Sequence, residues 1–319
     1  MVQIKNNNEL NFIIYCFFSF DKDMTGGNIV RHKLAYELAT RGCNVYMFTP
    51  PEYPHENIEV IPASVGEINE NTHHTWEGFT YPVDKTISIY PQMVYGNPFN
   101  TKHVCRWIMY HTTREIEESF ELEDFYFNFG DFKTFKKQST KSLTVFDYKL
   151  EKLYNKNLPN RRGFCHIIHK NHPDNFQEIF NFFKSDNLED FKKSKRFDFD
   201  YLRENFNKYE YFLTFDKKSF FTTAAALCGC KSIILNPEST TEFYENAYTD
   251  YRKKNSSITP FEYRLKNPIQ MFGVAYGLED ISWANNTINL SRNHIEDLET
   301  QDQKTVDAFV QFWKEKTKQ

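Results

Sequence analysis

Asp216, Lys218 and Ser219 stand together between two apolar segments, and their side chains carry the groups that bind sugar hydroxyls and phosphate. A carboxylate accepts hydrogen bonds, an ammonium binds phosphate as a point charge, and a hydroxyl both donates and accepts. Hydroxyl and backbone N–H groups that suit phosphate come from four consecutive or nearly consecutive residues: Ser219, Phe220, Thr222 and Thr223. This stretch could therefore hold a ligand that carries both hydroxyls and phosphate.

The segments around this stretch predict a strand, a loop, a helix and a second strand. The apolar runs at 211–215 and 231–235 suit buried strands, and the Ala- and Leu-rich run at 221–228 suits a short helix that ends at Gly229. Such a unit implies parallel strands, and ligands of open α/β sheets bind at the carboxyl ends of the strands. Two plainer interpretations stay open: Asp216 caps the helix, and 224–227 is ordinary helix packing.

The beginning of the chain predicts a similar arrangement. Residues 11–19 suit a buried strand, Gly26 and Gly27 follow in a loop, 28–41 has helical periodicity, and 45–48 suits the next strand. Two glycines let backbone N–H groups approach a ligand closely at the start of a helix. A tight turn with packing glycines is the equally open alternative.

His111 follows an apolar run at 104–110 that predicts a strand, so we expect it at a carboxyl end of the sheet. A histidine there could be a general base or could bind acceptor or phosphate, or it could be a hydrogen-bonded rim residue. The glutamates Glu115, Glu117 and Glu118 are expected on the solvated face of a helix. The pair His73–His74 is expected in a solvated loop.

A polar segment at 148–162 marks the expected boundary between a first domain, 1–155, and a second, 156–319. The second domain is expected to open with a strand at 163–170 that ends at Lys170. Further predicted elements are helices at 176–183, 187–193, 281–290 and 306–313, and a short strand at 197–200.

Composition bounds the class of protein. The chain of 319 residues is 40% apolar, with 32 Phe and 19 Tyr, which is typical of a folded protein of two domains. Its net charge of -4 lacks the overall excess of positive charge that is typical of proteins that bind nucleic acid. The six cysteines lack zinc-site spacing and no signal peptide or membrane span is evident, so we expect a reduced, cytoplasmic protein without a metal site. Abundant Phe, Tyr, Asn and Lys with 11 Gly is typical of an AT-rich genome, such as that of a virus; a viral protein would lie in the host cytoplasm.

Several short motifs, in their order, resemble those of GT-B glycosyltransferases. Many retaining members carry an acid, seven further residues and a second acid on a helix that ends near a glycine; counted back from Gly229, these positions are Asp216 and Ala224. A bacterial and viral branch shows related motifs, whose counterparts here are Gly26-Gly27, Leu34-Ala35-Tyr36-Glu37-Leu38, Arg41-Gly42, Tyr90-Pro91-Gln92, Gly96-Asn97-Pro98, Val104-Cys105-Arg106-Trp107, Arg161-Arg162-Gly163, Ala225-Ala226-Leu227-Cys228-Gly229 and Ala275-Tyr276-Gly277. Two positions depart from the branch: Ala224 replaces the acid that holds the donor ribose, and Gln92 replaces a glutamate.

The resemblance implies an α/β GT-B fold, with two Rossmann-like domains whose parallel sheets face each other across a cleft and a C-terminal helix that crosses back to the first domain. It places the acceptor on the first domain and a nucleotide sugar, with a UDP-sugar favoured, on the second. The implied reaction is transfer of a sugar, with a hexose favoured, to a glycan or other small acceptor, without metal or cofactor. The implied catalytic residues are His111 and Asp216, and the implied donor-binding residues are Gly26, Gly27, Lys170, Lys218, Ser219, Phe220, Thr222 and Thr223.

Two other functions stay open. Ala224 motivates a non-catalytic nucleotide- or sugar-binding protein of the same fold. A viral source would suit a DNA-modifying glucosyltransferase. The small net charge of the chain argues against binding to DNA, so no nucleic-acid partner is expected. A dehydrogenase is not expected, because the glycine fingerprint of dinucleotide-binding proteins is missing.

Overall fold

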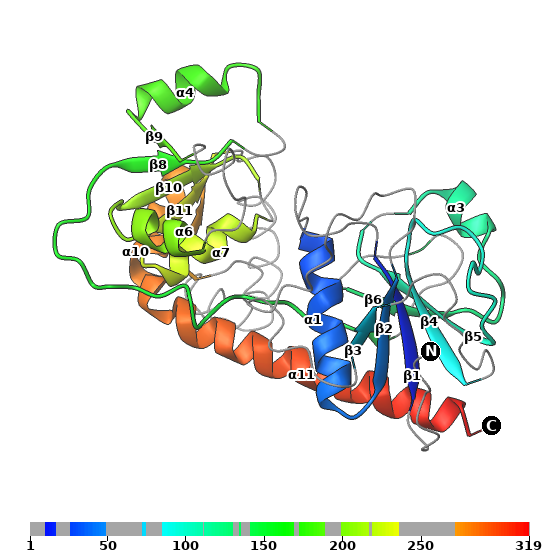
Figure 1. Cartoon of the computed structure of the whole chain (residues 1–319). Helices are drawn as coiled ribbons and strands as arrows, with labels where there is room; N and C mark the ends of the chain where they lie inside the picture. The colour runs from blue at the N-terminus through cyan, green and yellow to red at the C-terminus, as the bar shows by residue number, and fades with distance from the viewer. Residues whose placement is uncertain are drawn as a thin grey trace, which may run out of the picture. The chain divides into compact units, whose positions relative to one another are not determined.

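The computed structural model describes residues 10–16, 26–48, 72–74, 85–110, 112–129, 134, 141–168, 172–188, 199–216, 219–235 and 272–318. The chain divides into two compact units, one formed by Met1–Asp147 with Leu298–Gln319 and the other by Tyr148–Asp297. Each unit contains one parallel sheet with helices beside it (Figure 1). The predicted α/β class with two parallel sheets is therefore confirmed, whereas the assignment of acceptor and donor to the two domains stays a prediction.

The sheet of the first unit has the strand order β3-β2-β1-β4-β5-β6-β7, and every neighbouring pair is parallel. Its strands are β1 (Asn11–Tyr15), β2 (Asn44–Phe48), β3 (Thr72–His74), β4 (Thr86–Pro91), β5 (His103–Ile108), β6 (Phe125–Asn128) and β7 (Lys141–Ser142). The chain moves outward from β1 to β3 and then resumes at β4 on the other side of β1. The topological switch point of this sheet therefore lies between β1 and β4.

Two helices share one core with the first sheet. Helix α1 (Gly26–Thr40) contributes Val30, Leu34 and Leu38, and the later turns of α11 (Ser291–Lys316) contribute apolar side chains at helical spacing: Val306, Phe309, Val310 and Trp313. The Phe309 ring lies 5.7 Å from the Phe12 ring of β1 and 4.7 Å from the Phe127 ring of β6. The prediction of a C-terminal helix that packs on the first domain is confirmed, and α11 is drawn in orange to red in Figure 1.

Side chains of β5 alternate between the two faces of the first sheet, as a strand requires. Cys105 and Trp107 belong to the core shared with α1 and α11, whereas Ile108 packs with Phe120 and Tyr126 in a separate cluster. Helix α3 (Arg114–Glu118) lies beside this second cluster through Ile116.

The sheet of the second unit has the order β12-β11-β10-β8-β9, again with all neighbours parallel. Its strands are β8 (Phe164–His166), β9 (Asp186–Asn187), β10 (Tyr211–Thr214), β11 (Lys231–Ile234) and β12 (Val274–Tyr276). The helices of this unit are α4 (Phe176–Phe182), α6 (Phe199–Phe206), α7 (Phe220–Leu227), η1 (Leu278–Asp280), α10 (Ile281–Thr287) and η2 (Ile288–Leu290). The chain passes from β8 outward to β9 and then to β10 on the opposite side, so the switch point lies between β8 and β10.

Four sequence-based predictions need correction. Residues 199–200 begin helix α6 and do not form a strand, and His73–His74 belong to strand β3, which pairs with β2. Asn187, expected in a helix, is part of strand β9, and residues 189–193 lie outside the described part of the chain. Glu117, expected on a solvated face, is buried and accepts a hydrogen bond from the Thr112 hydroxyl, while Glu115 and Glu118 are exposed as predicted.

Candidate functional site

Asp216 lies just beyond the carboxyl end of β10, one of the two strands at the switch point of the second sheet. Its backbone N–H donates to the Thr214 hydroxyl at 3.1 Å, and the Thr214 carbonyl accepts from the Leu235 N–H at 2.7 Å. The pairing of β10 with β11 therefore continues to Thr214, and Phe215 and Asp216 follow directly after it. Asp216 itself is half-buried and lies at the edge of the sheet where ligands of open α/β sheets bind.

Ser219 caps helix α7. Its backbone is extended, with φ -78° and ψ 136°, and its hydroxyl oxygen accepts a hydrogen bond from the Phe221 N–H at 3.1 Å. The cap is thus Ser219 and not Asp216, which excludes the interpretation of Asp216 as the residue that caps this helix. Because the Ser219 oxygen acts as acceptor in the cap, its hydroxyl hydrogen is the group it could offer to an anion.

The two threonines of α7 are buried and already engaged within the unit. The Thr222 hydroxyl donates to the Ser219 carbonyl at 2.6 Å, and the Thr222 carbonyl accepts from the Ser232 hydroxyl at 3.0 Å. Thr223 lies beside Phe272 and His294, on the part of α7 that meets the start of α11. Their predicted role in donor binding stays a prediction, and the Thr222 hydroxyl hydrogen is already used inside the helix.

Ala224, which stands at the second acid position of the resembling family, is fully buried. Ala225, Ala226 and Leu227 are buried as well, so ordinary helix packing describes this segment. Gly229 ends α7 with φ +80°, and a Cβ there would lie 2.6 Å from the Asn155 amide nitrogen. The backbone conformation therefore favours a glycine, and a larger residue would also displace the Asn155 side chain.

The neighbouring strand β8 ends at His166, shortly before Lys170 in the sequence. The His166 ring stacks on the Phe180 ring at 3.7 Å, and its Nδ1 is 2.9 Å from the Ser185 hydroxyl oxygen. Since β8 and β10 are paired in parallel, the chain that leads to Lys170 leaves the sheet at the same edge as Asp216. Lys170, Lys218 and His111 themselves lie outside the described residues.

Strand β12 adds a turn at the same edge that the sequence patterns did not single out as a site. The Gly277 N–H donates to the Ile234 carbonyl at 2.9 Å, and the Asp280 carboxylate accepts from the Tyr276 N–H at 3.0 Å. Gly277 has φ +86°, a conformation that favours glycine. The Ala-Tyr-Gly motif was the only sequence signal for this turn.

In the first unit, Gly26 and Gly27 open helix α1 directly and so stand at its amino end, beyond β1. Two buried polar residues follow on the same helix, Arg31 and His32. The His32 Nε2 lies 3.9 Å from the Cys16 sulfur at the end of β1, and burial lowers the pKa of Arg31. The sequence patterns missed this cluster, because helical periodicity does not distinguish a buried Arg-His pair from solvated residues.

Within the described parts of the chain, no three His, Cys, Asp or Glu side chains are grouped so that they could hold a metal ion. No described helix combines the length and the apolar composition that a membrane span needs. Comparison with models of known protein families gives no match, and no curated protein is similar in sequence.

Proposed function

We propose that the chain is a glycosyltransferase of the GT-B type that moves a sugar from a nucleotide sugar to an acceptor. The observation that carries the proposal is the position of Asp216 at the switch point of a parallel sheet, directly before a helix capped by Ser219. Ligands of such sheets bind at this edge, and the combination of a carboxylate with a helix start suits a molecule that has hydroxyls at one end and phosphate at the other. A UDP-sugar is the favoured donor, a hexose the favoured group, and a glycan or small molecule the acceptor.

Each proposed residue has a distinct role. The Asp216 carboxylate accepts hydrogen bonds from the donor sugar, because two anions repel and it cannot serve the diphosphate. Lys170 and Lys218, with the Ser219 hydroxyl hydrogen and the positive amino end of α7, stabilise the charge that grows on the departing diphosphate. The acceptor oxygen bonds to the anomeric carbon as the bond to the diphosphate breaks, and His111 takes the acceptor proton.

One observation favours the second candidate, a non-catalytic protein that binds a nucleotide or sugar. Ala224 is buried against the rest of the unit and supplies no carboxylate where the resembling enzymes hold ribose. A donor would then be bound through its phosphates and its sugar, with the ribose held by other groups.

A thermal-shift panel with UDP, GDP, ADP and CMP tests the shared part of both candidates, because a ligand that binds the folded state raises its melting temperature. We expect UDP to stand out. Hydrolysis or transfer of the matching nucleotide sugar then supports the enzyme, and tight binding without either supports the non-catalytic protein. If no nucleotide shifts the melting temperature, the transferase and the non-catalytic nucleotide-binding protein are both wrong, and only a protein that binds a sugar alone remains. Salt-sensitive binding to duplex DNA at low salt would instead favour the DNA-modifying enzyme.

A further inference from the structure

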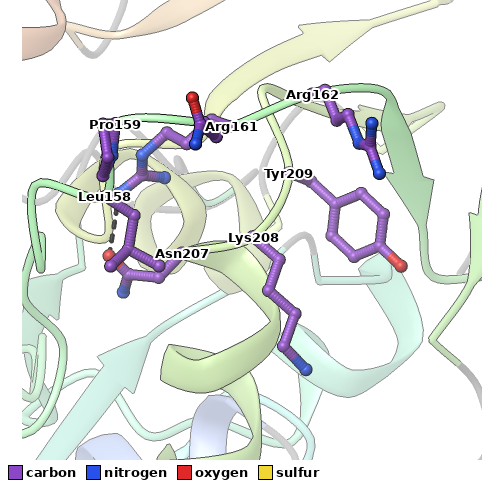
Figure 2. Close-up of a pocket in the computed structure, with 8 residues that line it drawn as sticks. Leu158, Pro159, Arg161, Arg162, Asn207, Lys208 and Tyr209 are labelled. Atoms are coloured by element: carbon purple, nitrogen blue, oxygen red, sulfur yellow. Dashed lines mark hydrogen bonds between the residues drawn. The ribbon is translucent and has the colours of Figure 1, made fainter.

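A hollow of about 340 Å³ lies at the amino ends of β8 and β10, the opposite end of these strands from Asp216. Two loops enclose it, one formed by residues 158–162 before β8 and one by 207–209 before β10 (Figure 2). The loops are joined through their backbones, because the Arg162 N–H donates to the Lys208 carbonyl at 3.3 Å. The volume is within the range of sites for small molecules.

One wall of the hollow is built around Arg161 and the buried Asn207. The Arg161 guanidinium donates to the Asn207 side-chain oxygen at 2.7 Å and to the Cys228 carbonyl at 2.6 Å. It also donates to the Phe206 carbonyl at 2.9 Å and to the Asn155 side-chain oxygen at 2.6 Å. All four acceptors are neutral, so the guanidinium is held in place, and none of the carboxylates that the structure describes forms an ion pair with it. Burial accordingly lowers the pKa of Arg161.

Two further cations line the hollow. Arg162 and Lys208 are exposed, and neither forms an ion pair with any residue that the structure describes; Lys208 Nζ contacts only the Asn205 side-chain oxygen, at 3.4 Å. Figure 2 shows both side chains on the loops around the hollow, with Tyr209 between them.

The carboxylates on neighbouring segments are engaged with other groups. Glu204 binds Lys156 at 2.5 Å, Glu210 binds Lys231 at 3.2 Å, and Asp186 accepts from the Tyr209 hydroxyl at 2.8 Å. Asp186 keeps its negative charge beside Tyr209, but no described carboxylate forms an ion pair with Arg161, Arg162 or Lys208. The three positive charges that line the hollow outnumber this one negative charge, which favours an anion there.

We propose that this hollow is a second binding site, for the phosphate or diphosphate group of a small molecule. Guanidinium groups match phosphate oxygens in geometry, and Lys208 adds a point charge. Leu158 and Pro159 offer an apolar wall for the rest of the molecule. The concave shape favours a small ligand over a nucleic-acid backbone, for which a stripe of cations is typical. The site is separate from the proposed donor site and does not depend on sugar transfer.

Titration calorimetry with inorganic pyrophosphate, on the full chain, tests the proposal. The decisive variant is Arg162→Gln with Lys208→Gln, which leaves the buried Arg161 and its partners intact. The matched control is Lys304→Gln with Lys314→Gln, which removes the same charge from exposed positions of α11. We expect the wild type and the control to bind pyrophosphate alike, and the Arg162/Lys208 variant to lose this binding by about tenfold or more. The affinity of UDP for the proposed donor site should be the same in all three proteins, whereas any second, weaker binding of UDP through its diphosphate to the hollow should be lost only in the Arg162/Lys208 variant.

Three outcomes would overturn the proposal: no binding of pyrophosphate to the wild type, equal binding to the wild type and the Arg162/Lys208 variant, or loss in the control as well. Binding of a single-stranded oligonucleotide that depends on Arg162 and Lys208, without binding of pyrophosphate, would assign the surface to nucleic acid and contradict the small ligand. These outcomes are independent of the nucleotide panel, so failure here and failure of the proposed transferase are distinguishable.

Discussion

The side chains of Arg106 and Asp124 form an ion pair of 2.7 Å inside the first unit, where both are almost completely buried. The Arg106 guanidinium also donates to the carbonyls of Val94 at 3.1 Å and Gly96 at 2.5 Å, and it lies 4.3 Å from the centre of the Phe120 ring. The buried Arg106 side chain of the Arg-Trp motif thus holds the Gly-Asn-Pro turn in place through the Gly96 carbonyl and fixes the loop after β4.

Replacement of Arg106 by Ala should destabilise the first unit severely, because it leaves the Asp124 charge buried without a partner. We expect a loss of about 3–5 kcal/mol in the free energy of unfolding, measured by urea denaturation. The exposed Arg114→Ala serves as control and should change stability by less than about 0.5 kcal/mol. An effect of similar size in both variants would contradict a structural role for Arg106.

Local patterns predicted the elements around Asp216 well. The apolar runs and the glycine that ends the helix placed β10, α7 and β11 within one residue of their observed ends. A strand was predicted at 197–200 because Phe and Asp alternate there with the period of a strand. In the structure Leu202 and Phe206 are buried, and the Phe206 ring packs on the Phe212 ring of β10 at 5.3 Å. These contacts come from one face of a helix, so tertiary packing favours the helix α6 over a strand.

The polar clusters could not be predicted in this way. Arg161 meets Asn207 and Cys228, and Arg106 meets Asp124, across long stretches of sequence. Nothing in a local pattern says that an arginine will be buried, since most arginines are exposed. The Ser219 cap was within reach of local rules, because serine before a helix is a preferred cap, but Asp216 is an equally good capping residue.

The side chain of Asp302 on α11 predicts a pH-dependent stability. Burial raises its pKa to about 7, although the Phe146 N–H, which donates to it at 3.0 Å, acts in the opposite direction. Between about pH 4 and pH 7 the folded chain then holds a proton that the unfolded chain has released, so the free energy of unfolding falls as pH rises through this window. Asp302→Asn, which mimics the protonated form, should remove this part of the decrease in thermal melts. The exposed Asp297→Asn should keep it, and equal slopes in the two variants would show that Asp302 is not the responsible group.

Two substitutions at Ser219 separate helix capping from ligand binding. Ser219→Ala should lower stability by about 0.5–2 kcal/mol, because the Phe221 N–H loses its acceptor. Ser219→Asp should keep an acceptor for the Phe221 N–H but weaken nucleotide binding, because its charge repels phosphate. Urea denaturation and titration calorimetry with UDP measure the two effects. Unchanged affinity in Ser219→Asp would place the phosphates away from the start of α7.

Chelation tests how the leaving diphosphate is stabilised. The proposal assigns this charge to Lys170, Lys218 and the start of α7, so sugar transfer should continue in the presence of EDTA. The measurement is the initial rate of transfer from purified donor to acceptor, before and after chelation. Loss of turnover that manganese restores would mean that a metal ion carries the charge.

The account depends most directly on Asp216, and the variant Asp216→Asn tests it. Asn has nearly the same shape but lacks the charge and one acceptor, and Ser219 supplies the cap of α7 in either case. The account predicts that Asp216→Asn melts within a few degrees of the wild type and binds free UDP normally. It predicts that transfer falls by at least about tenfold, or about 1.4 kcal/mol of transition-state stabilisation. The exposed Glu178→Gln, which removes one charge from α4, should transfer at the wild-type rate. Full transfer by Asp216→Asn would contradict the placement of the donor sugar at this edge of the second sheet.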